Sequence, residues 1–176
     1  MINKMKHKIF LGLGSNIGDR AENIISALSI LQSSGFVNIQ KISSFYETSA
    51  VGPKQRKFYN VVVQAQTNLT PQNLLTLVKQ TEVILGRKPS GKWLPRVIDI
   101  DILFYGRSVI NSQLSILNSQ LPLIVPHKEI EHRLFVLIPL AEIAPNFVHP
   151  VLNRKINNIL KINSLTLLNQ KVRITA

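Results

Sequence analysis

The sequence has no cysteine, and only nine of its 176 residues are acidic. Without thiols the chain can form neither disulfides nor thiolate metal sites, a composition compatible with a cytoplasmic protein. Its apolar runs are far shorter than the roughly 20 residues of a membrane-spanning helix. Its basic start leads into a short strand-like run rather than into the apolar region of a signal peptide. We therefore expect a cytoplasmic protein with no membrane partner.

The length fits one domain that is large enough to bury a sizeable core. We assign residues 1–162 to this domain and give the tail, 163–176, no role. The 21 lysines and arginines outnumber the acids and give a formal net charge of +12. This excess favours an anionic partner, whether nucleotide, nucleic acid or acidic surface.

Two of the three aspartates, Asp99 and Asp101, lie within an otherwise apolar run at 97–105. In a strand, residues two apart point to the same face, with Cα atoms roughly 6–7 Å apart. One face is then apolar and suited to the core: Ile98, Ile100, Ile102 and Phe104. The other carries both carboxylates, together with Val97, Leu103 and Tyr105. Such like charges repel unless cations lie between them, and oxygen ligands suit Mg²⁺. Two ordinary acids on a solvated sheet face are the alternative interpretation.

The segment before this strand, residues 86–96, holds four cations, two glycines, two prolines and the only tryptophan. Glycine and proline predict a loop. Cations on a loop beside paired carboxylates are typical of polyphosphate chemistry, because metals bridge phosphate oxygens while Arg and Lys neutralise charge. The start of the loop fits a P-loop pattern, but Trp93 stands where Ser or Thr is needed. The early glycines fail the dinucleotide pattern, because Ile17 takes the place of the third glycine.

The pattern of apolar residues predicts six elements in the order β-α-β-β-α-β, a ferredoxin-like α+β arrangement with an antiparallel sheet. Asp19 can cap the first helix, which Gly35 ends, and Thr70-Pro71 opens the second, which Gly86 ends. Strands are expected at 8–13, 36–46, 58–67 and 97–105, and helices at 19–34 and 70–85. A loop at 122–126 and additional helices at 133–144 and 151–162 follow.

Two aromatic residues flank the expected sheet, Phe58 before the third strand and Phe135 in the third helix. Each suits the core, and both could stack on a flat ring. Asn60 could recognise the edge of a heterocycle, since an amide both donates and accepts hydrogen bonds, or it could satisfy a turn. His127 and His132 are five residues apart, which does not match a helical zinc pair. His127 as a cation, or as a donor to phosphate, stays open.

Four collinear segments resemble the 6-hydroxymethyl-7,8-dihydropterin pyrophosphokinase family of folate biosynthesis. They are Leu13-Gly14-Ser15-Asn16-Ile17-Gly18-Asp19-Arg20, Ser44-Phe45-Tyr46-Glu47-Thr48 with Phe58-Tyr59-Asn60, Leu85-Gly86-Arg87 through Asp101-Ile102-Leu103, and Val125-Pro126-His127 through Arg133-Leu134-Phe135 to Leu140. Together they cover roughly residues 8–150. The family fold is ferredoxin-like α+β, in agreement with the element order.

The resemblance implies an ATP-dependent diphosphotransferase that acts on the reduced pterin, releases AMP and works as a monomer. It implies that Asp99 and Asp101 hold two Mg²⁺ ions and that Arg87, Lys92 and Arg96 act in catalysis. It places the ATP contacts at Leu75, Lys79, Glu82, Ile102, His127 and Arg133. It places the pterin between Phe58 and Phe135, with Thr48, Val51, Asn60 and Trp93 around it.

An RRM-like single-stranded RNA-binding module is the alternative, since it shares the element order and the basic charge. An RRM stacks bases on aromatic residues of its third strand. Here that strand reads Phe58-Tyr59-Asn60-Val61-Val62-Val63-Gln64, without the alternating aromatics. The two aspartates on the last strand would also repel a phosphate backbone, so we expect no nucleic-acid partner.

Overall fold

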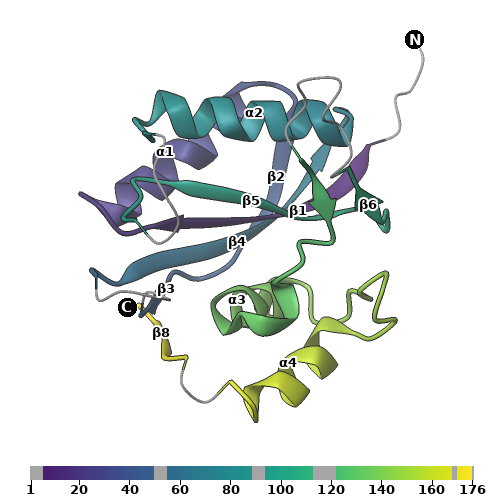
Figure 1. Ribbon diagram of the computed structural model, residues 1–176. Helices are drawn as coiled ribbons and strands as arrows, with labels where there is room; N and C mark the ends of the chain where they lie inside the picture. Colours follow the sequence, from purple (N-terminus) through teal and green to yellow (C-terminus); the bar gives the residue numbers. More distant parts are fainter. Residues whose placement is uncertain (1–5, 50–54, 89–93, 113–121, 168–169, 176) are drawn as a thin grey trace.

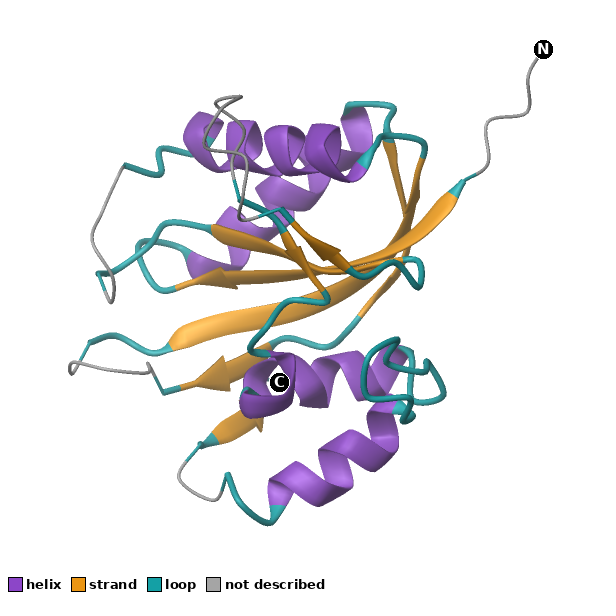
Figure 2. Ribbon diagram, turned by 45° about the vertical axis from the view of Figure 1, so that its right-hand side comes forward, coloured by secondary structure: helices purple, strands orange, loops and turns teal. Residues whose placement is uncertain are grey.

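The computed structural model describes residues 6–49, 55–88, 94–112, 122–167 and 170–175. Its elements form three layers, with a central sheet between two pairs of helices (Figures 1 and 2). One helical layer consists of α1 (Arg20–Ser33) and α2 (Pro71–Ile84), and the other of α3 (Leu134–Ile143) and α4 (Ile156–Ser164). The main strands are β1 (His7–Ser15), β2 (Val37–Ile42), β3 (Tyr46–Thr48), β4 (Phe58–Thr67), β5 (Asp99–Tyr105) and β8 (Val172–Ile174). A short pair, β6 (Ile110–Asn111) and β7 (Ile124–Val125), forms a separate sheet.

The first two helices begin where their sequence signals lie. The Asp19 carboxylate accepts the Glu22 N–H at 3.1 Å, and the Thr70 hydroxyl accepts the Asn73 N–H at 3.3 Å. Each of these bonds satisfies one N–H that lacks a partner within the helix. Gly35 and Gly86 follow the two helices with φ values of +73° and +87°, which glycine adopts without steric cost. The predicted starts and ends of both helices are therefore confirmed to within two residues.

The sheet has the strand order β5-β1-β4-β3-β8, and β2 also pairs with β4. Every pairing in it is antiparallel. The expected ferredoxin-like order is therefore confirmed, with α1 and α2 on one face of the sheet. The helices α3 and α4 cover the other face, which gives the protein a second apolar core.

The predicted alternation along β5 holds only for its first half. The β1–β5 register shifts between Phe10 and Leu11, so that Leu103 has no partner across the ladder. The extra residue moves the following side chains to the opposite faces. Phe104 therefore packs toward α3 and α4, and Tyr105 toward α1 and α2, the reverse of the faces predicted for them.

The predicted strand at 36–46 is also wrong in part, because it is two strands, β2 and β3. Between them the Ser43 hydroxyl accepts the Val62 N–H at 3.0 Å, while the Ser43 N–H donates to the Val62 carbonyl at 2.9 Å. This side-chain bond takes the place of a ladder bond, and β4 continues past it to pair with both strands.

The C-terminal third differs most from expectation. The segment 122–126, predicted as a loop, contains β7, and α4 covers 156–164 rather than 151–162. The tail, to which no role was given, contributes β8, which pairs with β3. Among the described residues, no helix has the length and apolarity needed to cross a membrane.

Candidate active site

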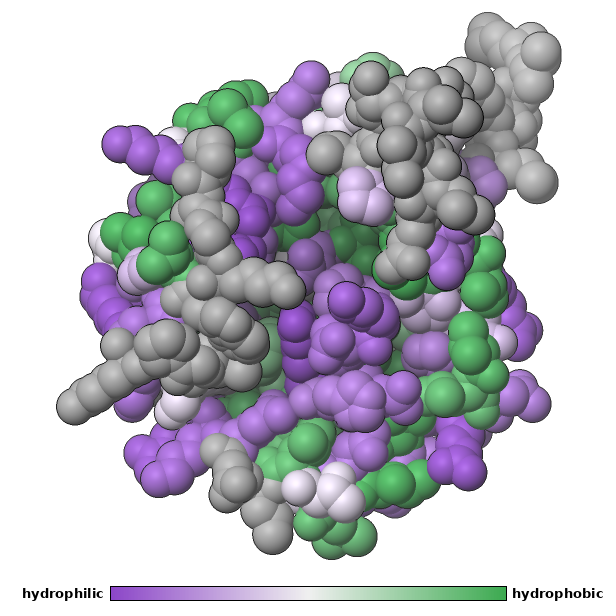
Figure 3. All heavy atoms as spheres, in the orientation of Figure 1, coloured by the Kyte–Doolittle hydropathy of each residue, from purple (hydrophilic) through white to green (hydrophobic). Residues whose placement is uncertain are grey.

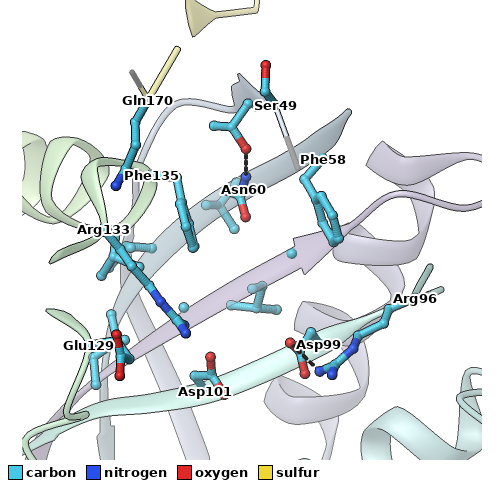
Figure 4. Close-up of a pocket in the computed structure, with 18 of the residues that line it drawn as sticks. Ser49, Phe58, Asn60, Arg96, Asp99, Asp101, Glu129, Arg133, Phe135 and Gln170 are labelled. Atoms are coloured by element: carbon cyan, nitrogen blue, oxygen red, sulfur yellow. Dashed lines mark hydrogen bonds and ion pairs between the residues drawn. The ribbon is translucent and has the colours of Figure 1, made fainter. Parts of the chain in front are cut away.

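A cavity of about 310 Å³ opens between the sheet and the beginning of α3 (Figure 4). In the space-filling view, hydrophilic side chains gather across the middle of this face of the molecule (Figure 3). The strands β1, β4 and β5 form the floor of the cavity, and residues 129–136 form one wall. The predicted site residues that line it are Thr48, Phe58, Asn60, Arg96, Asp99, Asp101, Arg133 and Phe135.

Asp99, at the start of β5, lies between two arginines. Its Oδ1 is 2.8 Å from Nη1 of Arg87, and its Oδ2 is 2.7 Å from Nη1 of Arg96. Both guanidinium groups are largely buried, so that the pairs are less screened than surface ion pairs. The carboxylate predicted to hold a metal is thus neutralised by the two arginines that were predicted to contact phosphate.

Glu82, on α2, holds one of these arginines in place. Its side chain is 2% exposed, and Oε1 accepts the Ile100 N–H at 2.7 Å and lies 2.9 Å from Nζ of Lys79. Nη1 of Arg87 pairs with the same oxygen. A buried carboxylate needs such partners. In this conformation Glu82 links α2 to β5 and fixes Arg87 beside Asp99.

Asp101, two residues further along β5, has no arginine partner among the described residues. The titratable side chain beside it is His127, whose Nε2 is 3.8 Å from Oδ2. Nδ1 of His127 accepts the Glu129 N–H at 3.3 Å, so the ring proton belongs on Nε2 and faces Asp101. Burial lowers the pKa of His127, and this effect exceeds the opposing attraction of Asp101. His127 is therefore a neutral donor at neutral pH, which favours the second of the two roles left open by the sequence.

Phe58 and Phe135 come from opposite walls of the cavity, with open space between their rings (Figure 4). Phe58 begins β4, and Phe135 lies in the first turn of α3. Asn60 lies on the floor between them, and its Nδ2 donates to the Thr48 hydroxyl at 2.8 Å. That bond leaves the Asn60 carbonyl oxygen on the cavity side with a fixed amide orientation. The geometry suits a flat heterocycle with polar edges.

Gly12 and Gly14 on β1 separate the aromatic end of the cavity from the carboxylate end. Across the sheet, Gly12 pairs with Asp101 and Val62, and Gly14 pairs with Asp99 and Asn60. A Cβ at position 14 would lie 2.9 Å from Oδ1 of Asn60, whereas one at position 12 would meet only Leu103 carbons, at 3.4 Å or more. The sequence presented these glycines as a failed nucleotide motif. In the structure, the lack of a side chain at Gly14 leaves room for the Asn60 amide.

This difference predicts unequal effects of two matched substitutions. For the substrates that the family resemblance implies, Gly14→Ala is expected to tilt the Asn60 amide and raise the KM for the pterin by about tenfold, the cost of about one hydrogen bond. The KM for ATP should stay nearly unchanged. Gly12→Ala adds a methyl group on the same face of the same strand without approaching Asn60, so it should raise the pterin KM less than Gly14→Ala does. Steady-state kinetics with each substrate varied in turn measures both. Equal pterin KM values for the two variants would contradict the assigned role of Gly14.

Several residues of the site were not predicted. Asn16 is buried, accepts the Arg96 N–H at 2.7 Å through Oδ1, and donates its own N–H to the Arg96 carbonyl at 3.0 Å. It thereby fixes the backbone that carries Arg96. Its segment belongs to the family resemblance, but sequence alone gives no sign of a contact 80 residues away. Glu129, His132 and Gln170 also line the cavity.

Other predicted site residues lie away from the cavity. Leu75 and Ile102 are buried in the core on the α1–α2 side, and Lys79 lies beside Glu82 at the junction of α2 and β5. Their proposed contacts with ATP remain predictions. Val51, Lys92 and Trp93 lie outside the described residues.

The donor set fits Mg²⁺ better than any softer metal. Asp99 and Asp101 offer carboxylate oxygens, and Mg²⁺ is typically held by one or two carboxylates together with water and phosphate oxygens. The described residues contain no cluster of three or more His, Asp or Glu side chains that could bind a metal without such added ligands. A metal at Asp99 would compete with Arg87 and Arg96 for the same oxygens, which would free the two arginines for phosphate.

Fold and site together define an α+β protein in which paired carboxylates, arginines and a ring-sized cavity meet on one face of the sheet, an arrangement typical of phosphoryl-transfer enzymes. The sequence profile of the 7,8-dihydro-6-hydroxymethylpterin-pyrophosphokinase family matches residues 10–145. The chain belongs to this family, the pyrophosphokinases of folate biosynthesis, as the resemblance predicted.

Curated relatives and solved structures agree with this membership. The chain is 43% identical over 158 residues to the 2-amino-4-hydroxy-6-hydroxymethyldihydropteridine pyrophosphokinase of Aquifex aeolicus, with 89% of this chain and 92% of the relative covered. It is 42% identical over 140 residues to the enzyme of the same name from Bacillus subtilis, with 79% of each chain covered.

A crystal structure of the Plasmodium falciparum HPPK-DHPS protein with pteroate has the same fold. It superimposes with a TM-score of 0.73 at 17% identity, covering 96% of this chain and 45% of the longer one. The fold class is therefore confirmed, and the enzyme interpretation is favoured over the RNA-binding alternative.

Proposed function

We propose that the cavity binds 6-hydroxymethyl-7,8-dihydropterin and ATP together, and that the protein transfers diphosphate from ATP to the hydroxymethyl oxygen of the pterin and releases AMP. The observation that carries the proposal is the arrangement of the cavity. A slot between two phenylalanines and a pair of carboxylates flanked by arginines share one floor, separated only by two glycines. Two substrates held at the two ends of this floor meet above Gly12 and Gly14.

The pterin is assigned to the aromatic end. Phe58 and Phe135 can cover the two faces of a bicyclic ring, and the Asn60 amide can recognise its polar edge. Because Thr48 already holds one side of that amide, little side-chain entropy is lost on binding. The hydroxymethyl group of a ring in this slot would point along the floor toward the carboxylates.

The triphosphate is assigned to the other end, where Arg96 and Arg133 line the cavity. Arg87 pairs there with Asp99, and His127 lies beside Asp101. Arginine suits phosphate because its planar donors can bind two oxygens at once. His127, neutral with its proton on Nε2, can donate to a phosphate oxygen without a change of protonation state. When bound, two Mg²⁺ ions at Asp99 and Asp101 would supply charge neutralisation and activate the accepting hydroxyl.

The residues of this chain hold the reacting groups in line, which is the main protein contribution to phosphoryl transfer. Without ligands, Arg87 and Arg96 form ion pairs with Asp99. If both arginines instead bind phosphate, the Asp99 carboxylate becomes free to hold a metal ion. During this exchange Glu82 still pairs with the side chain of Arg87. Asn16 still holds the backbone of Arg96.

An AMP-release assay tests the proposal directly. With ATP, Mg²⁺ and the reduced pterin, purified protein is expected to form AMP and the pterin diphosphate in equal amounts. ATP and Mg²⁺ without the pterin should give no AMP above background, since no acceptor is present. Pterin-independent AMP formation, or ADP as the product, would overturn the assignment of diphosphate transfer to this acceptor.

A further inference from the structure

Gln170, in the tail that the sequence left without a role, contacts the main chain on both sides of Arg133. Its Oε1 accepts the Leu134 N–H at 2.8 Å, and its Nε2 donates to the His132 carbonyl at 2.8 Å. Both are short, and together they use one donor and one acceptor of the amide. Gln170 itself lines the cavity beside Arg133 and Phe135 (Figure 4).

These two bonds replace the missing cap of α3. The first N–H groups of a helix have no partner within it, and Arg133, the residue at the cap position, makes no side-chain cap bond. Gln170 supplies that bond from 36 residues away. Because it fixes the peptide groups on both sides of Arg133, it also fixes the direction in which the Arg133 side chain enters the cavity. Phe135 follows Leu134 in the first turn of α3, so the same bonds also fix the position of its backbone.

The chain after Gln170 is anchored to the opposite wall. Val172–Ile174 pairs with Tyr46–Thr48, and the Thr175 N–H donates to the Phe45 carbonyl at 2.9 Å. Thr48 in turn accepts the hydrogen bond from Asn60. Figure 1 shows β8 beside β3, at the side of the sheet where α3 lies. Thr48 also pairs with Phe58 across the sheet. The described tail, 170–175, therefore connects the Phe58 wall of the cavity to the Arg133 and Phe135 wall.

We propose that Gln170 is a positioning residue of the active site and that the C-terminal segment sets the separation of the two walls between which the pterin binds. The proposal rests on the function proposed above, because it assigns the pterin to this cavity. Gln170 does not react. It holds Arg133 and Phe135 in the places from which they contact the two substrates.

Gln170→Ala tests the proposal, with Lys171→Ala, an exposed neighbour in the same segment, as the control. Gln170→Ala removes both hydrogen bonds, and we expect part of their free energy to reach the substrates through Arg133 and Phe135. The KM for both the pterin and ATP should therefore rise by about threefold to tenfold, with kcat changed less. Gln170→Glu sets a carboxylate oxygen against the His132 carbonyl and a negative charge beside Arg133, so its KM for ATP should rise at least as much as in Gln170→Ala. A merely structural role would instead lower the active fraction, and so kcat, at unchanged KM, and that result overturns the proposal.

Hydrogen exchange of the ligand-free protein gives a readout that needs no turnover. In Gln170→Ala, the amides at the start of α3 should exchange several-fold faster than in wild type and in Lys171→Ala, because the Leu134 N–H has lost its acceptor. Unchanged exchange there overturns the proposal even if the wild-type enzyme forms AMP. If wild type forms no AMP, the proposed function fails on its own assay, and faster exchange at Leu134 still supports the anchoring by Gln170.

Discussion

Asp101→Asn is expected to lower kcat/KM for AMP formation by at least about 10³-fold while the fold remains intact. Asparagine keeps the size of the side chain but removes the charge that a divalent cation requires. The side chain of Asp101 is 36% exposed, and the one titratable side chain within 4 Å of its carboxylate among the described residues is His127, at 3.8 Å. Loss of the carboxylate therefore breaks no buried ion pair, and the midpoint of thermal unfolding should stay within a few degrees of wild type.

Glu131→Gln is the matched control for this prediction. Glu131 is also a partly exposed carboxylate beside a histidine, with Oε1 3.9 Å from Nε2 of His132. Its removal changes the net charge by the same amount but should alter the rate by less than about twofold. Turnover at a wild-type rate in Asp101→Asn, measured at saturating Mg²⁺, would refute the metal assignment.

Asp99 is a less informative position for the same test. Its carboxylate neutralises both Arg87 and Arg96, so Asp99→Asn would remove the carboxylate partner of Arg96 and, among the described residues, leave Arg87 with Glu82 alone. Removing one partner of a partly buried ion pair destabilises the fold, because the remaining charge is poorly solvated. A loss of activity in Asp99→Asn would then have two explanations, whereas Asp101→Asn separates the metal site from the stability of the fold.

Local signals predicted the first two-thirds of the fold well. Short-range signals include the caps at Asp19 and Thr70, the glycines after both helices and the apolar run of β4. Each depends on residues close together in the sequence and can therefore be inferred from the sequence. The errors lie where partners distant in the sequence decide the outcome. The register shift opposite Phe10 turns Phe104 to the other face, and Ser43 interrupts a strand through its bond to Val62.

The same division applies to the site. Asp99 and Asp101 could be found because two charges in an apolar strand are costly without a cation, a local anomaly. Phe58, Asn60 and Phe135 needed the family resemblance, since each also suits an ordinary structural role. Asn16 and Gln170 act on the backbone of distant segments through hydrogen bonds, and no pattern in the sequence marks them. Their contacts depend on tertiary structure alone.

Phe58→Ala is expected to raise the dissociation constant for the pterin by about 30-fold, because one face of the ring loses its stacking partner and about 2 kcal/mol of contact. ATP affinity should change less, since the Phe58 ring offers no hydrogen-bond donor to a phosphate oxygen. Phe58 is preferred to Phe135 for this test, because Phe135 also packs against the second core, and its removal would cost stability as well.

Phe58→Tyr keeps the flat ring and should restore most of the affinity, whereas Phe58→Leu, apolar but not flat, should restore less. Phe36→Ala, at a half-exposed phenylalanine outside the cavity, is the control. Calorimetric titration with the pterin measures all four variants, and equal losses of pterin and ATP affinity in Phe58→Ala would show that the ring supports the fold rather than the substrate.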